Sequence, residues 1–243
     1  MQTKVKHYEF LAQSNGIPRG NVTSEVTDAL RQAIVTLAMK PGEVIDKSAI
    51  CARMGVSRFP ISEALARLQA EGLVDIQPQR GTTVSLIRIS DVSEYSLIRK
   101  AIEAEAVQAL VAARIPDIVA HLEDCLAKQR AATEADDREA FHQLDCEFHE
   151  LLFAAMQFSK VKSIIDTIRA NMDRARRLIT KPRRLAPTIE EHEAIVAAIA
   201  AGDGDAAAHQ MRTHIDAVMA EIIAFAQQEP QHFADGEALS GLS

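Results

Sequence analysis

Aspartate and histidine residues with metal-ligand chemistry occur at three places in the second half of the chain. Asp145 and His149 are four residues apart, so on a helix both side chains lie on one face. His192 and His214 follow in two later stretches of helical periodicity. One carboxylate and three imidazoles from three helices can converge inside a bundle, where helical proteins commonly build metal sites.

The residues alone leave simpler interpretations open. An Asp–His pair at helical spacing is more often a surface hydrogen bond, and most single histidines bind no metal. His142 shares the face of Asp145 and is a competing ligand, although a neighbouring or surface role suits it equally. Three nitrogens and one oxygen would suit Zn²⁺, Ni²⁺, Fe²⁺ or Mn²⁺ and would leave coordination positions open.

The elements that position these residues are predicted to be helical. Apolar periodicity continues from residue 89 to about 229 and is broken at Pro116, Ser159 and Gly202. It predicts an all-α, six-helix antiparallel bundle, with helices near 91–114, 116–133, 137–156, 160–179, 188–201 and 204–227. We expect residues 230–243 to form a disordered tail.

Residues 21–88 predict a different unit. A helix begins at Thr23, a second follows the N-cap Asp46 and ends at Gly55, and a third begins at Ser57. The period then changes to that of strands at 73–76 and 82–86, which flank a turn. Three helices and a β-hairpin make a winged helix-turn-helix, so the fold class is mainly α, and residues 1–20 are expected to be a flexible arm.

The third helix of such a unit enters the major groove of DNA. Arg58 in its first turn can bind a guanine or a phosphate, and Arg80 at the hairpin tip can reach the minor groove. Arg67 lies further along, where it faces the DNA backbone or solvent. Each arginine is otherwise a solvated surface residue. The candidate DNA-binding residues are Ser57, Arg58, Phe59, Ser62, Arg67, Arg80 and Gly81.

Charge and composition limit the possible functions. The net charge is −7, but residues 21–88 carry eight Lys and Arg against seven Asp and Glu, so DNA binding would depend on a few placed groups. No apolar run approaches the roughly 20 residues of a membrane span, and no secretory segment opens the chain, so we expect a cytoplasmic location. Three widely spaced cysteines favour reduced thiols.

Residues 23–86 closely resemble the GntR family of bacterial transcription regulators. The resemblance rests on Pro41-Gly42-Glu43, on Gly55-Val56-Ser57-Arg58-x-Pro60-Ile61-x-Glu63-Ala64-Leu65, on Glu71-Gly72-Leu73-Val74 and on Arg80-Gly81-x-x-Val84. Two positions depart from the family pattern. Many relatives have arginine where this chain has Ser62, and the commonest have threonine in place of Phe59, which implies a different operator or weaker binding.

Residues 91–227 resemble the FCD ligand-binding domain of the FadR-like branch, with six helices as in its VanR-like subgroup. The shared motifs are Asp145-x-x-x-His149, Glu191-His192-x-x-Ile195 and Met211-x-x-His214. The resemblance implies a divalent metal held by Asp145, His149, His192 and His214, and an effector-binding arginine at Arg99. The alternative for Arg99 is a salt bridge to Glu103. Phe158 replaces a customary asparagine, which puts the local loop in doubt.

The resemblance implies a regulator, not an enzyme, that binds operator DNA as a homodimer and responds to a small carboxylate effector at the metal-containing pocket. Repression is the commoner family behaviour. One alternative is a metal-sensing repressor without an organic effector. A metal-dependent hydrolase with Glu147 as its base is a second alternative, disfavoured by the fusion to a DNA-binding unit.

Overall fold

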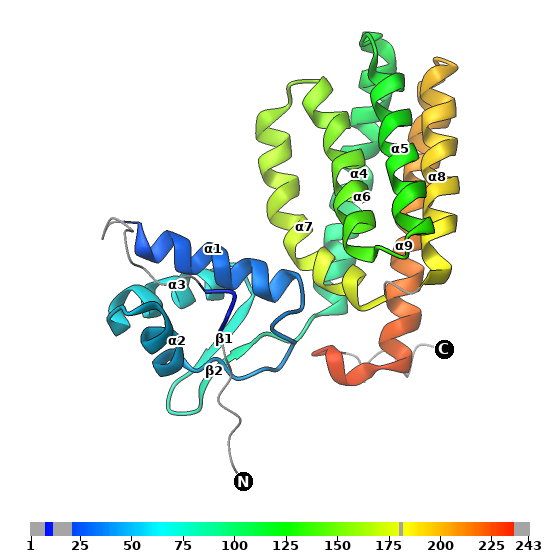
Figure 1. The fold of residues 1–243 in the computed structure, drawn as a ribbon. Helices are drawn as coiled ribbons and strands as arrows, with labels where there is room; N and C mark the ends of the chain where they lie inside the picture. Colours follow the sequence, from blue (N-terminus) through cyan, green and yellow to red (C-terminus); the bar gives the residue numbers. More distant parts are fainter. Residues whose placement is uncertain (1–7, 12–20, 180–181, 236–243) are drawn as a thin grey trace. The chain divides into compact units, whose positions relative to one another are not determined.

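The computed structural model describes residues 8–11, 21–179 and 182–235; for residues 162–164, 166–171, 182 and 183 it describes only the backbone (Figure 1). The chain divides into two units. The first runs to Arg88 and includes residues 229–236, and the second begins at Ile89 and runs to Gln228. No helix in the described part is long and apolar enough to cross a lipid bilayer.

The first unit is a winged helix-turn-helix. Its elements are α1 (Val22–Val35), α2 (Lys47–Met54), α3 (Arg58–Ala70), β1 (Val74–Gln77) and β2 (Gly81–Val84). Asp46 caps α2 by accepting hydrogen bonds from the backbone N–H groups of Ser48 and Ala49. Gly55 ends that helix with a φ of 68°, which a residue without a Cβ adopts at low cost. The strands pair antiparallel, with Val74 opposite Val84.

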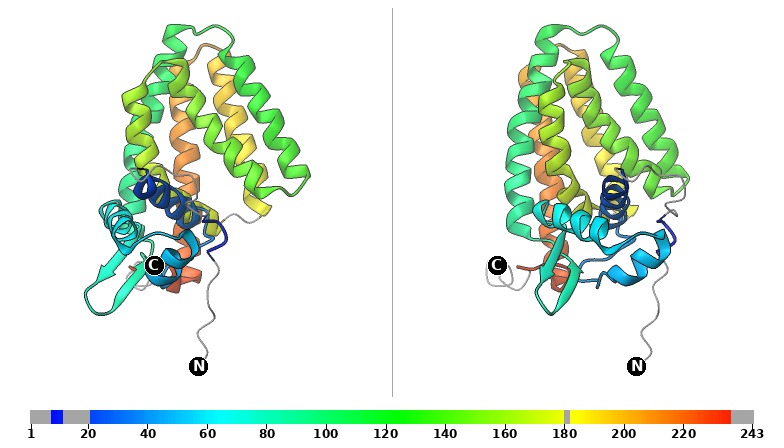
Figure 2. Two further views of the ribbon diagram at one scale, coloured as in Figure 1. Left: turned by 60° about the vertical axis from the view of Figure 1, so that its left-hand side comes forward. Right: turned by 90° about the vertical axis from the view of Figure 1, so that its left-hand side faces the viewer.

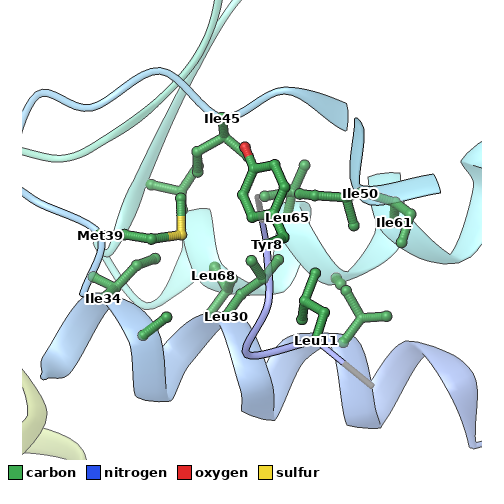
Figure 3. Close-up of a cluster of buried hydrophobic side chains, with 14 of the residues drawn as sticks. Tyr8, Leu11, Leu30, Ile34, Met39, Ile45, Ile50, Ile61, Leu65 and Leu68 are labelled. Atoms are coloured by element: carbon green, nitrogen blue, oxygen red, sulfur yellow. The ribbon is translucent and has the colours of Figure 1, made fainter. Parts of the chain in front are cut away.

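The expected flexible arm is partly wrong, because Tyr8 and Leu11 are buried in the core of the first unit. Figure 3 shows both side chains among Leu30, Ile50 and Leu65, which come from the three helices. The Tyr8 hydroxyl accepts a hydrogen bond of 2.8 Å from the backbone N–H of Asp46. Residues 1–7 and 12–20 lie outside the described part.

The expected disordered tail is also wrong for residues 230–235. Pro230–His232 form a short 3-10 helix, and Phe233 is buried and forms a parallel bridge with Ile87. The N–H of Ala234 donates to the carbonyl of Ile87 at 2.7 Å. These contacts place residues 230–235 with the first unit, whereas the sequence predicted only a disordered tail after residue 229. Residues 236–243 lie outside the described part.

The second unit is a bundle of six helices within the described residues (Figure 2). They are α4 (Ile89–Ala113), α5 (Ile118–Glu134), α6 (Arg138–Ala155), α7 (Ser159–Ile179), α8 (Pro182–Ala200) and α9 (Gly204–Gln228). Helix α4 packs against α6, α7 and α9, while α5 packs against α6 and α8. A core of apolar residues that includes Phe148, Ile195 and Met211 lies between α4, α5, α6, α8 and α9.

Local signals explain most of the boundaries in the bundle. Asp137 caps α6 by accepting from the N–H of Ala140, and Gly202 turns the chain toward α9 with a φ of 72°. The helix predicted near 188–201 begins earlier than expected, because α8 starts at Pro182 and contains Pro187. Because proline has no N–H, α8 lacks one backbone hydrogen bond in its second turn.

Candidate metal centre and DNA-binding surface

The four predicted metal ligands meet inside the bundle. Asp145 and His149 come from α6, His192 from α8 and His214 from α9, and none is more than 1% exposed. One ligand atom from each lies within 4.8 Å of every other. The helical spacing of Asp145 and His149 does place them on one face, and the packing of α8 and α9 brings the other two imidazoles to that face.

Each imidazole is held by an oxygen at its Nδ1 atom. The contacts are His149 with Glu103 Oε2 at 2.7 Å, His192 with Gln129 Oε1 at 3.1 Å, and His214 with Glu191 Oε2 at 2.8 Å. The Gln129 amide is oriented by its own N–H, which donates to the carbonyl of Leu144. Because carboxylate and amide oxygens only accept, Nδ1 of His192 and of His214 carries the proton and Nε2 keeps a lone pair. The close contact of His149 Nδ1 with Glu103 favours the same tautomer.

Those three Nε2 lone pairs are buried, and no hydrogen-bond partner for them occurs among the residues that the structure describes. Burying a polar atom without a partner is costly, so this arrangement needs a compensating group. Asp145 adds a carboxylate whose Oδ1 lies 3.8 Å from His192 Nε2. Metal-binding histidines typically show this pattern, with one ring nitrogen fixed by an outer partner and the other aimed at the ion.

The protonation states favour cation binding at neutral pH. Burial lowers the pKa of His149 to about 4 despite the opposing charge of Glu103, and burial likewise lowers the pKa of His192. Burial raises the pKa of Asp145, but the groups around it, the Arg176 guanidinium foremost, together hold that pKa well below its usual range. His149 and His192 are therefore neutral and Asp145 is ionised at neutral pH, the states in which these groups bind metal.

The donor set and its spacing fit a divalent transition metal. Three imidazole nitrogens and one carboxylate oxygen match Zn²⁺, Ni²⁺, Fe²⁺ or Mn²⁺, and fewer than six protein ligands leave positions open in an octahedral ion. The ring of Phe148 stacks on His192 with centroids 4.0 Å apart, which fixes the plane of that imidazole.

Arg99 forms the salt bridge that was the alternative to effector binding. Its Nε and Nη2 donate to the two carboxylate oxygens of Glu103 at 2.5 and 3.1 Å, and both side chains are buried. Glu103 in turn contacts His149. Arg99 is thus linked to the candidate ligand His149 through Glu103, and its role as an effector ligand stays a prediction.

A small cavity adjoins the centre, and two arginines line it. The cavity has a volume of about 40 Å³, and its lining includes Asp145, Arg176 and Arg184. Arg176 Nη1 lies 2.6 Å from Asp145 Oδ2, and Arg184 pairs with Glu191 at 2.8 Å. Arg174 and Arg176 on α7 are both buried.

Two other residues weighed in the sequence lie away from the ligand set. His142 is buried on α6, and its Nε2 lies 3.8 Å from Cys146 Sγ and not within the group of four ligands. Glu147 is exposed on α6 while the four ligands are buried, so it does not face them as a base for hydrolysis. Of the outer partners, Glu191 belongs to the motif Glu191-His192-x-x-Ile195, whereas no motif indicated Gln129.

The predicted DNA-binding residues lie on one helix and one turn of the first unit. Ser57, Arg58, Phe59, Ser62 and Arg67 are exposed along α3, and Arg80 and Gly81 are exposed at the turn between the strands. Ser57 starts the helix without a capping hydrogen bond from its side chain, and Phe59 is 75% exposed. Arg67 pairs with Glu63 at 2.7 Å, which partly neutralises it.

Sequence profiles of two families match this chain. "Bacterial regulatory proteins, gntR family" matches residues 22–84, and "FCD domain" matches residues 94–217. An HTH-type transcriptional regulator of Streptomyces ambofaciens is 34% identical over 94% of this chain and 95% of its own length. The chain belongs to the GntR family. The HTH-type transcriptional repressor RspR of Escherichia coli is 30% identical over 90% of this chain and 96% of its length.

This GntR-family protein is therefore a DNA-binding transcriptional regulator with an FCD domain, and not an enzyme. Solved structures show the same fold. Escherichia coli McbR/YncC matches with a TM-score of 0.70 at 23% identity, covering 84% of this chain and 97% of that one. A GntR regulator of Rhodococcus sp. RHA1 matches with a TM-score of 0.71 at 24% identity, covering 83% and 97%.

Proposed function

We propose that the protein is a repressor that binds its operator as a homodimer and is controlled by a small carboxylate at a metal-containing pocket of the FCD domain. The observation that carries the proposal is the convergence of three buried Nε2 lone pairs and the Asp145 carboxylate. A divalent cation bound there would supply open coordination positions for a carboxylate oxygen. The name of the E. coli relative RspR supports repression.

The residues beside the centre favour an anionic effector. Arg176 and Arg184 line the cavity next to Asp145, and guanidinium groups bind carboxylates through paired hydrogen bonds. The cavity of about 40 Å³ has room for a few water molecules or a carboxylate group. A larger effector must therefore move side chains of α7 or α8, and this movement gives ligand binding a way to favour one arrangement of the bundle.

The DNA-binding half of the proposal rests on the exposed face of α3 and the hairpin turn. Arg58 lies in the first turn of α3, where unpaired backbone N–H groups also attract phosphate. Two-fold symmetry would place two such helices in successive major grooves of a roughly palindromic site. Effector binding and operator binding are then coupled reciprocally.

Calorimetry and fluorescence anisotropy on the full-length protein test this function. DNA flanking the protein's own gene provides the operator probe, and a panel of small mono- and dicarboxylates provides the ligands. We expect a carboxylate to bind only when the protein is loaded with metal, and to lower the affinity of the protein for its operator. Arg184→Gln should weaken that carboxylate at least tenfold, whereas Arg130→Gln, at a half-exposed position on α5, should leave it unchanged.

Other outcomes contradict the proposal in distinguishable ways. Operator release on chelation alone, with no carboxylate bound under any condition, indicates a metal sensor. Carboxylate binding that is equal with and without metal removes the metal from the recognition step.

A further inference from the structure

A second group of potential ligands lies outside the centre described above. His142 and Cys146 are four residues apart on α6, and Asp173 faces them from α7. The three separations are 3.7 Å from His142 Nε2 to Asp173 Oδ2, 3.8 Å from that Nε2 to Cys146 Sγ, and 4.0 Å from Sγ to Oδ2. The same three atoms therefore form one triangle.

The two sulfur edges of this triangle are long, weak hydrogen bonds, and the separations also fit a shared ion. A nitrogen and an oxygen 3.7 Å apart exceed the usual hydrogen-bond distance, and one proton bridges only one edge. Tetrahedral Zn²⁺ with bonds of about 2.0 to 2.3 Å places its ligand atoms roughly 3.3 to 3.6 Å apart. A cation at the centre would contact all three atoms after a contraction of a few tenths of an ångström.

The donor set differs in kind from that of the first centre. A sulfur, a nitrogen and an oxygen suit a thiophilic divalent ion such as Zn²⁺, because soft thiolate ligands select such metals. His142 and Asp173 are almost fully buried, while Cys146 is partly exposed and gives solvent a route to the site.

We propose that His142, Cys146 and Asp173 form a second metal site that takes a zinc-like divalent cation. Binding forms a bond between the ion and Sγ and releases the thiol proton to solvent. The ion ties α6 to α7 beside the Asp145–Arg176 contact between the same helices. The site does not depend on the proposed function of the first centre.

Titration of metal-free full-length protein with Co²⁺ tests the site, because only a thiolate ligand gives a sulfur-to-cobalt charge-transfer band in the near ultraviolet. The first centre contains no sulfur. We expect two Co²⁺ ions per chain, with the band accompanying one of them. Cys146→Ser should abolish the band and the binding of one Co²⁺ ion. Asp173→Asn should weaken the affinity for the ion that gives the band at least tenfold, and His214→Ala should keep the band.

The remaining cysteines provide controls. Cys51→Ser should leave the band unchanged, and burial raises the pKa of Cys125 to about 12, which disfavours its thiolate. Zinc should also slow the alkylation of Cys146 in the wild-type protein at least tenfold, a measurement that needs no variant. A missing band, a band that survives Cys146→Ser, or alkylation at an unchanged rate with zinc overturns the proposal.

Discussion

The buried ion pair between Arg99 and Glu103 gives a prediction that separates folding from metal binding. Both side chains are at most 1% exposed, and Glu103 also contacts His149 Nδ1. Arg99→Met leaves a carboxylate buried without its main counter-charge. Breaking a buried pair from one side costs about 3 to 5 kcal/mol of unfolding free energy. Replacing both charges, in Arg99→Met with Glu103→Leu, restores most of that loss because apolar side chains pack in their place.

The double variant should nevertheless bind metal poorly. Loss of Glu103 frees the His149 ring, and losing such an outer partner lowers metal affinity about 10- to 100-fold. Urea unfolding of the metal-free protein measures the stability, and competition with a chromophoric chelator measures the affinity. Lys128→Met is the matched control, since Lys128 pairs with Asp124 at the same helical spacing but both are more than half exposed. It should leave the unfolding free energy nearly unchanged, because an exposed ion pair contributes little to stability.

Two results would refute this reasoning. If the double variant binds metal as tightly as the wild type, Glu103 does not position His149. If Arg99→Met costs no more than Lys128→Met, the pair is not a buried charge pair in solution. A double variant that keeps its metal but loses carboxylate binding would instead assign Arg99 to the effector.

Three further predictions concern other parts of the molecule. Arg58→Ala should weaken operator binding and make the slope of log affinity against log salt shallower by about 0.9, whereas Ser62→Arg should steepen that slope by a similar amount. The control Arg212→Ala, exposed on α9, should change neither the affinity nor the slope, and equal slopes for all three variants would contradict the assigned DNA surface. In metal-free protein, burial lowers the pKa of His149 to about 4, so the unfolded state binds more protons than the folded state between pH 6.5 and about 4. The unfolding free energy should therefore fall by about 3 kcal/mol as the pH drops through that window, and urea titrations that show constant stability would rule this out. Tyr8→Phe should lower the unfolding free energy by about 1 kcal/mol, because the Asp46 N–H loses its acceptor. Phe10→Leu, at an exposed neighbouring position, should cause no measurable loss, and equal stabilities of the two variants would show that residues 8–11 do not pack on the first unit.

The sequence predicted the elements well because their signals are local. The N-cap Asp46, the left-handed Gly55 and the change of period after α3 each act within a few residues. Segments whose order depends on distant contacts were missed. Tyr8 and Phe233 carry little periodicity around them, and each is held by apolar burial against residues far along the chain.

The metal ligands were predictable for a similar reason, since their spacing and motifs are written in the sequence. Their outer partners were not. Gln129 is one buried amide on α5, and nothing near it in sequence indicates that His192 lies opposite. Nothing local in the sequence distinguishes Arg176 from Arg174 and Arg177, and the packing of α7 on α6 brings it to Asp145.

Metal analysis of the purified full-length protein tests the central claim most directly. In a Cys146→Ser background, which removes the second proposed site, we expect one divalent transition-metal ion per chain. His192→Ala and His214→Ala should each lose it, while His209→Ala, exposed on the same helix as His214, should keep it. Protein that binds no ion even when supplied with zinc, nickel, iron and manganese, or an ion that survives both ligand variants, would contradict the account.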